Sequence, residues 1–164
     1  MFTMTILALA LIISFFTDIK NRKILNIVTL PSILTGFVFN TISMGWDGFV
    51  FSTLGLLTGF GLLILPYALG GMAAGDVKLL MAIGALKGST FVFGSFLYIA
   101  IIGGIIALII LLKKKELLSS LQRIFLSAQL RTLNNLSKNE LHHAFPYGVA
   151  IVLGTVLYTG VNVF

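Results

Sequence analysis

The sequence predicts an all-α integral membrane protein, a bundle of about six transmembrane helices with one amphipathic helix on the cytoplasmic side. Of its 164 residues, 58% are hydrophobic and only 10% are charged, and the mean hydropathy is +1.08. Soluble domains carry roughly 25% charged residues, so this composition excludes a water-soluble globule. Because a spanning helix needs roughly 20 residues, the chain, residues 1–164, forms a single membrane domain.

Apolar stretches separated by polar or charged residues define the predicted spans. They cover residues 1–17, 24–44, 49–69, 74–87, 91–112 and 144–164, and residues 116–141 form the amphipathic segment. The fourth stretch is short, because a turn-like segment begins at Lys87. If this stretch crosses, Lys87 is the only one of the 11 Lys and Arg residues on its side of the membrane. That distribution satisfies the positive-inside rule, so both termini are expected outside.

The net charge and the absence of cysteine exclude further classes of function. With a net charge of +6 on so apolar a chain, the expected partner surface is membrane lipid rather than nucleic acid. The sequence contains no Cys, which excludes disulfides, thiolate zinc sites, iron–sulfur clusters and a cysteine nucleophile. His142 and His143 are adjacent, so they do not form the i, i+4 pair of a helix-borne metal site. We therefore expect no metal and no cofactor.

Two of the five acidic residues stand at the cytoplasmic ends of predicted spans. Asp18 ends the first span and Asp76 opens the fourth, whereas Asp47, Glu116 and Glu140 are expected to be solvated charges. Acids at membrane depth are candidates for function. Two neighbouring carboxylates that share one proton provide a base and an acid, which can activate water against a peptide bond. The alternatives are that Asp18 marks a span boundary and that Asp76 caps a helix N-terminus.

A run of small residues comes immediately before Asp76. The segment Gly70-Gly-Met-Ala-Ala-Gly75 allows another backbone to come close, or allows the chain to leave helical geometry, so a substrate strand could lie there. Small residues also pack helices against one another in bilayers, as Gly55-Leu-Leu-Thr-Gly59 is expected to do in the third span. Both explanations apply to the run before Asp76.

Two sequence motifs resemble those of the type IV prepilin peptidases, membrane aspartyl proteases with a GxGD motif. They are Asp18-Ile-Lys-Asn-Arg-Lys-Ile-Leu-Asn26 and Gly71-Met-Ala-Ala-Gly-Asp-Val-Lys-Leu-Leu80. Phe145-Pro-Tyr-Gly148 is similar to a Pro-Phe-Gly element of that family, and the small size is closest to its Tad/Cpa-like branch. The chain departs from the pattern at Ala73, in place of the first motif Gly, and at Leu25, where the family often has Pro.

The resemblance implies a role for each residue of these motifs. Asp18 and Asp76 are the expected catalytic pair. The residues expected to support the loop or contact the substrate are Gly71, Ala73, Gly75, Lys78, Lys20, Arg22 and Asn26. For the basic residues, including Lys23, anchoring to anionic lipid is an alternative. Asn26 is expected either to hydrogen-bond near Asp18 or to cap the end of a helix.

The resemblance also implies a substrate and a location. Prepilins or pseudopilins are expected to lose a short leader ending in Gly at the cytoplasmic face of a prokaryotic cytoplasmic membrane. N-methyltransferase activity is not expected, because members with that activity carry an additional domain with paired CxxC motifs and this chain has no Cys.

Two other functions stay open. Asp18 and Asp76 could relay protons or bind a cation in a small transporter, although such sites normally lie near the bilayer midplane. Ala73 at the motif position could instead indicate a catalytically inactive pilus-assembly factor. The sequence does not specify which prepilin is cleaved or the oligomeric state.

Overall fold

The computed structural model describes residues 2–113 and 147–163. All of the regular secondary structure in this part of the chain is helical. Its helices are α1 (Phe2–Asn21), α2 (Asn26–Met44), α3 (Trp46–Ala68), α4 (Ala74–Lys87), α5 (Ser89–Lys113) and α8 (Tyr147–Val163). The predicted amphipathic segment, residues 116–141, and the adjacent histidines lie outside the described residues. The prediction of an all-α membrane bundle is confirmed, since four of the described helices, α1, α2, α3 and α5, are long and apolar enough to span a bilayer.

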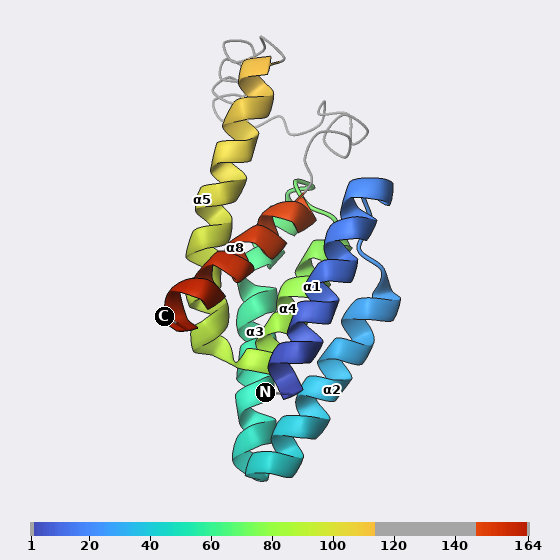
Figure 1. Ribbon diagram of the computed structural model, residues 1–164, viewed down its shortest axis with the longest axis vertical. Helices are drawn as coiled ribbons and strands as arrows, with labels where there is room; N and C mark the ends of the chain where they lie inside the picture. The colour runs from blue at the N-terminus through green and yellow to red at the C-terminus, as the bar shows by residue number, and fades with distance from the viewer. Residues whose placement is uncertain (1, 114–146, 164) are drawn as a thin grey trace.

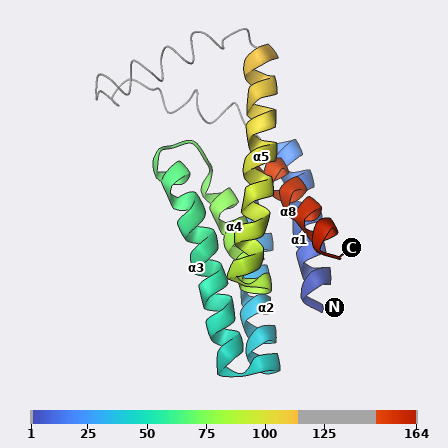
Figure 2. The ribbon, with the colours of Figure 1, turned by 90° about the vertical axis from the view of Figure 1, so that its left-hand side faces the viewer.

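The helices from α1 to α5 run alternately up and down the bundle, and α8 lies across α5 and α1 (Figures 1 and 2). The short helix α4 contacts each of the other five described helices. Its fully buried side chains include Leu79, Leu80 and Ile83. A helix that is apolar on all sides belongs in the interior of a bundle. The surrounding helices therefore separate α4 from lipid along much of its length.

Glycines bring the backbones of α3 and α4 into direct contact. A Cβ atom added to Gly55 would lie 2.0 Å from the carbonyl oxygen of Gly84, and one added to Gly59 would lie 2.6 Å from that of Leu80. Real side chains do not tolerate such approaches, so only Gly fits. The Gly55-x-x-x-Gly59 pattern thus packs one helix on another, the role that small residues play in bilayers.

A buried polar cluster ties α2, α3 and α4 together. The Nδ2 of Asn40 donates to the Oγ of Ser52 at 2.9 Å and to the carbonyl oxygen of Ala85 at 3.1 Å. Ser52 in turn donates to the same carbonyl oxygen at 2.9 Å. Because buried polar groups need partners, this cluster fixes the register of the three helices. The α2–α3 turn nearby uses Gly45, whose φ of 62° favours glycine.

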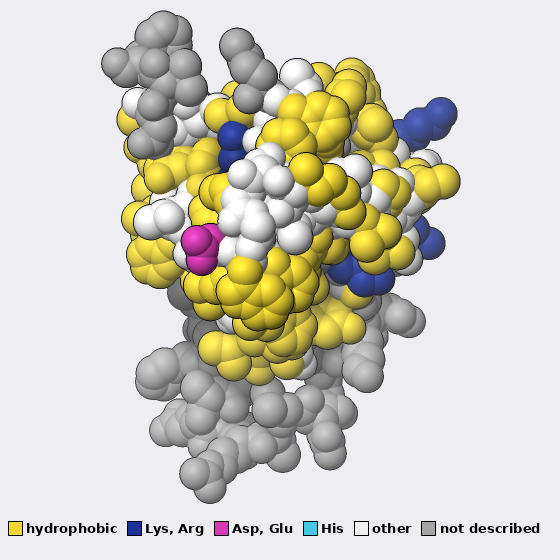
Figure 3. All heavy atoms as spheres, turned by 90° about the horizontal axis from the view of Figure 1, so that it is seen from below, with side chains coloured by type: hydrophobic (Ala, Val, Ile, Leu, Met, Phe, Trp, Pro, Cys, Tyr) yellow, Lys and Arg dark blue, Asp and Glu magenta, His cyan; other side chains and the backbone are white. Residues whose placement is uncertain are grey.

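The surface of the bundle is suited to lipid. Seen from the end where α2 turns into α3, the described residues show mostly hydrophobic side chains and few charges (Figure 3). Trp46 is exposed at this turn and stacks on Phe49, with ring centroids 5.3 Å apart. Exposed tryptophan is typical of the membrane–water interface. The fold is therefore that of a multi-pass membrane protein.

Candidate active site

Asp18 lies in the last turn of α1 and points into the bundle. Its side chain is only 5% exposed, and it shares a buried helix face with Leu7, Leu11 and Ser14, at spacings of three or four residues. Arg22 follows the helix with a φ of 50° and donates its N–H to the carbonyl oxygen of Asp18 at 2.8 Å. Because α1 ends at Asn21 and the chain turns at Arg22, the Asp18 carboxylate lies near the end of the bundle.

The N-terminus of α8 holds the Asp18 carboxylate. The backbone N–H of Val149 donates to Oδ2 of Asp18 at 3.0 Å, and the N–H of Gly148 also interacts with the carboxylate. The first N–H groups of a helix have no partner within the helix, and the helix dipole favours a negative charge at that end. A Cβ on Gly148 would lie 2.7 Å from Oδ2, so glycine is what allows this contact.

Asp76 lies in the first turn of α4 and is also only 5% exposed. Its Oδ2 accepts the backbone N–H of Ala73 at 3.2 Å, so Asp76 does cap its own helix, as one of the sequence alternatives proposed. Ala73 has a φ of −84° and a ψ of 151°, an extended conformation that any residue adopts. Alanine therefore fits without backbone strain at the position where the GxGD motif has its first Gly.

The tertiary structure brings the two acids to the same end of the bundle. The C-terminal end of α1 and the N-terminal ends of α4 and α8 meet there (Figure 1). The carboxylates of Asp18 and Asp76 interact electrostatically, and Asp76 also interacts with Tyr147. Two neighbouring buried carboxyl groups can share one proton, and one can then act as a base while the other acts as an acid.

The small-residue loop between α3 and α4 passes close to the chain that follows α1. Gly71 donates its N–H to the carbonyl oxygen of Pro66 at 3.0 Å, which closes the turn after α3. A Cβ on Gly75 would lie 3.0 Å from both the Cβ and the carbonyl oxygen of Ile24. Since Ile24 is buried, Gly75 lets this segment lie directly on the first turn of α4. The two motifs are therefore packed against each other.

The predicted polar and basic residues occupy different positions around this end. Lys78 donates from Nζ to Oδ1 of Asn26 at 3.0 Å, which joins the start of α4 to the start of α2. Asn26 is the first residue of α2, so the expectation that it caps the end of a helix is wrong, and its side chain accepts the hydrogen bond from Lys78. Arg22 is exposed and interacts electrostatically with Asp18. Lys20 is exposed in the last turn of α1, where a cation complements the helix dipole.

Comparison with known proteins identifies a family for this chain. The sequence profile of the Type IV leader peptidase family matches residues 5–108, which include both aspartates and the segments around them. The chain belongs to the type IV leader peptidase family. No curated protein and no solved structure matches the chain. Family membership supports a protease of the leader peptidase type.

The leader peptidase match ends before α8, so the contribution of that helix comes from the structure. Sequence reasoning missed the N–H groups that hold Asp18 and the buried side chain of Ile24 below Gly75. The segment that resembles the Pro-Phe-Gly element pointed to these N–H groups, because it includes Gly148. Within residues 2–113 and 147–163, no group of three or more His, Cys, Asp or Glu side chains is placed to hold a metal ion.

Proposed function

We propose that this protein is a membrane aspartyl endopeptidase that removes the short leader of type IV prepilin-like or pseudopilin substrates. The observation that carries the proposal is the pair of buried carboxylates, Asp18 and Asp76, which come from separate helices and interact at one end of the bundle. The leader peptidase family match supports the substrate class. Both aspartates also lie within the residues that the family match covers.

The chemistry follows from one proton shared by the pair. The ionised carboxylate takes a proton from a water molecule, and the water oxygen forms a bond to the carbonyl carbon of the scissile peptide. The protonated carboxyl donates its proton to the carbonyl oxygen, which gives a tetrahedral intermediate. When the C–N bond breaks, the leaving nitrogen receives a proton from one carboxyl group of the pair, and the other carboxylate takes a proton from a hydroxyl of the intermediate, so that a carboxylic acid and an amine are released and the pair again holds one proton. The N–H groups of α8 keep the Asp18 carboxylate in a fixed orientation during these steps.

The location at the end of the bundle fits a substrate that must unwind before it is cut. Helical carbonyl groups are engaged in their own hydrogen bonds, so hydrolysis needs an unwound segment where water is available. A Gly before the scissile bond favours unwinding. Lys20, Arg22, Lys23 and Lys78 lie in the segments at this end, while Lys87 ends α4 at the other. By the positive-inside rule, this distribution supports a site that faces the cytoplasm.

The proposal is tested by cleavage of candidate prepilins in isolated membranes. The substrate panel carries basic leaders ending in Gly, and the wild type is compared with the Asp18→Asn, Asp76→Asn double variant at matched expression. We expect the wild type to cut after the Gly, as located by mass spectrometry, and the double variant to leave the leader in place. If the double variant cleaved as the wild type does, the mechanism would be wrong. If the wild type left every prepilin intact, the peptidase proposal would fail.

A smaller change next to Asp18 tests the contact with α8. Gly148→Ala places a methyl group 2.7 Å from Oδ2 of Asp18, which is closer than the two atoms can pack, so the carboxylate must move. Because a displacement of about 1 Å can cost roughly 100-fold in rate, we expect cleavage to fall by about 10- to 100-fold. Gly160→Ala is the matched control, since it lies on the same helix with nothing within 4 Å of the added Cβ. Equal rates for these two variants, both folded, would contradict the assigned contact.

A further inference from the structure

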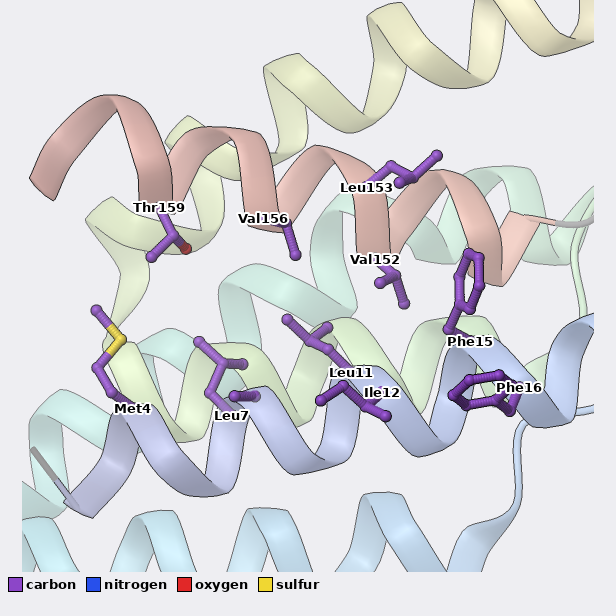
Figure 4. A pocket seen from close by; sticks show the side chains of 11 residues that line it. Met4, Leu7, Leu11, Ile12, Phe15, Phe16, Val152, Leu153, Val156 and Thr159 are labelled. Carbon is purple, nitrogen blue, oxygen red and sulfur yellow. The ribbon is translucent and has the colours of Figure 1, made fainter. Parts of the chain in front are cut away.

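An apolar groove runs between α1 and α8. Its volume is about 410 Å³, and its walls are hydrophobic side chains of the two helices (Figure 4). The one hydroxyl group in its lining belongs to Thr159, which donates to the carbonyl oxygen of Thr155 at 2.7 Å. The lining side chains therefore offer apolar surface to an occupant, which suits hydrocarbon and excludes a charged or strongly polar ligand.

The groove leads to the proposed catalytic pair. On α1, Leu7, Leu11, Phe15 and Asp18 follow one another at spacings of four, four and three residues, so they share a helix face. On α8, Val149, Val152 and Val156 share a face in the same way. In Figure 4, Leu7 and Leu11 of the first face point toward Val152 and Val156 of the second.

The two lining faces converge at one contact. The hydrogen bond from Val149 to Asp18 joins the helices there, and the groove opens beyond it along α1 toward the N-terminus. Any chain that passes the Asp18 carboxylate and enters the bilayer alongside α1 therefore meets this groove first.

We propose that this groove receives the apolar helix that follows the scissile bond of the substrate. The inference rests on the proposed peptidase function. Lining residues extend from Met4 to Phe16, a length of about 18 Å, or roughly three helical turns. A lipid chain would match the apolar walls, but it would not account for a groove that begins one helical turn from Asp18.

The open side of the groove allows the substrate helix to enter from the bilayer. Ile12 and Phe16 line the groove and are 53% and 65% exposed, so the substrate helix can slide in sideways without crossing a polar barrier. Entry from the side suits a substrate whose apolar segment is already in the membrane.

Chain direction sets the register of the bound helix. Because α1 runs toward the site and the substrate runs away from it after the cut, the substrate helix must lie antiparallel to α1. Its first turn after the cut is then nearest Phe16, and a position about eight residues further on is nearest Ala8. This pairing of substrate positions with Phe16 and Ala8 is expected only if the scissile bond of the substrate is bound at Asp18.

Disulfide crosslinking tests the register directly, because the chain has no Cys of its own. Phe16→Cys, Ala8→Cys and the control Leu9→Cys are each made in the Asp76→Asn protein, so that the substrate stays whole. Leu9 is 60% exposed on α1 but does not line the groove. The probe is a synthetic peptide with a basic leader ending in Gly, an apolar helix of about 20 residues, and one Cys about 4 or about 12 residues after the Gly.

We expect Phe16→Cys to react with the near Cys and Ala8→Cys with the far one, at least 10-fold faster than the exchanged pairs and than Leu9→Cys. Equal reaction at Leu9→Cys, or equal reaction of the same apolar helix without its leader, would overturn the proposal. So would crosslinks between two copies of the protein at Phe16→Cys in place of crosslinks to the peptide. Absence of reaction at both groove positions would overturn it as well.

The crosslinking result is independent of catalysis. Crosslinks in the expected order, combined with failure of the wild type to cut any prepilin, would refute the peptidase function and leave the docking site standing. Cleavage by the wild type without these crosslinks would refute only the proposal that the groove receives the substrate helix.

Discussion

Replacement of either Asp18 or Asp76 by Asn is expected to stop leader cleavage as completely as replacement of both. The two carboxylates are buried and interact electrostatically, and the proposed reaction needs one as a base and the other as an acid. Each single Asn variant should therefore lose roughly 1,000-fold in cleavage rate, and the double variant should lose little more, because residues that act as a unit are not additive.

The same pair sets the expected pH dependence. The active form carries one proton on the two carboxyl groups, so activity falls at low pH, when both are protonated, and at high pH, when both are ionised. We expect a bell-shaped profile of cleavage rate against pH in detergent-solubilised wild type. A single Asn variant should have no such maximum in whatever cleavage remains.

Asp47→Asn is the matched control for these variants. Asp47 lies in the first turn of α3, where the α2–α3 turn leads into that helix, at the other end of the bundle from the site (Figure 1). This variant should cleave at the wild-type rate with the wild-type pH profile. If Asp76→Asn or Asp18→Asn kept more than about 10% of the wild-type rate, a single carboxyl group would suffice and the two-carboxylate mechanism would be refuted.

Gly55→Ala is expected to be among the single-methyl changes that destabilise the fold most. The added Cβ would lie 2.0 Å from the carbonyl oxygen of Gly84, and both atoms belong to rigid helices, so α3 and α4 must move apart. Overpacking of this kind costs about 3 kcal/mol. That is a large share of the roughly 5–15 kcal/mol by which folded proteins are stable. The free energy of unfolding, measured by denaturant titration in mixed micelles, checks this result.

Gly61→Ala provides the control on the same helix. Nothing lies within 4 Å of a Cβ added there, and alanine is a better helix former than glycine. This variant should be as stable as the wild type or more stable by about 0.5–1 kcal/mol. Gly84→Ala, which makes the mirror-image clash with the carbonyl oxygen of Gly55 at 2.0 Å, should resemble Gly55→Ala. Equal stability of the Gly55 and Gly61 variants would show that the helices are not packed as described.

Much of the fold class was predictable because hydropathy and charge are local properties of the chain. Long apolar stretches predict helices in a bilayer, and the segments between them carry the polar residues. The same patterns do not reveal that α4 lies at the centre of the bundle, because an apolar helix can face either lipid or protein. Its burial depends on the close approach at Gly55 and Gly84, which involves two segments far apart in the sequence.

The candidate site, like the fold, could be predicted from the sequence only in part. Asp18 and Asp76 were identifiable from the sequence, because each follows or opens an apolar stretch and each belongs to a recognisable motif. The tertiary structure decided what surrounds them: Val149, which is 131 residues from Asp18, holds its carboxylate, and Lys78 binds Asn26. These contacts depend on how whole helices pack, and packing is determined by side chains from many segments together. The sequence by itself thus determined which groups are available for chemistry, and the packing of α1, α4 and α8 determined which of them meet.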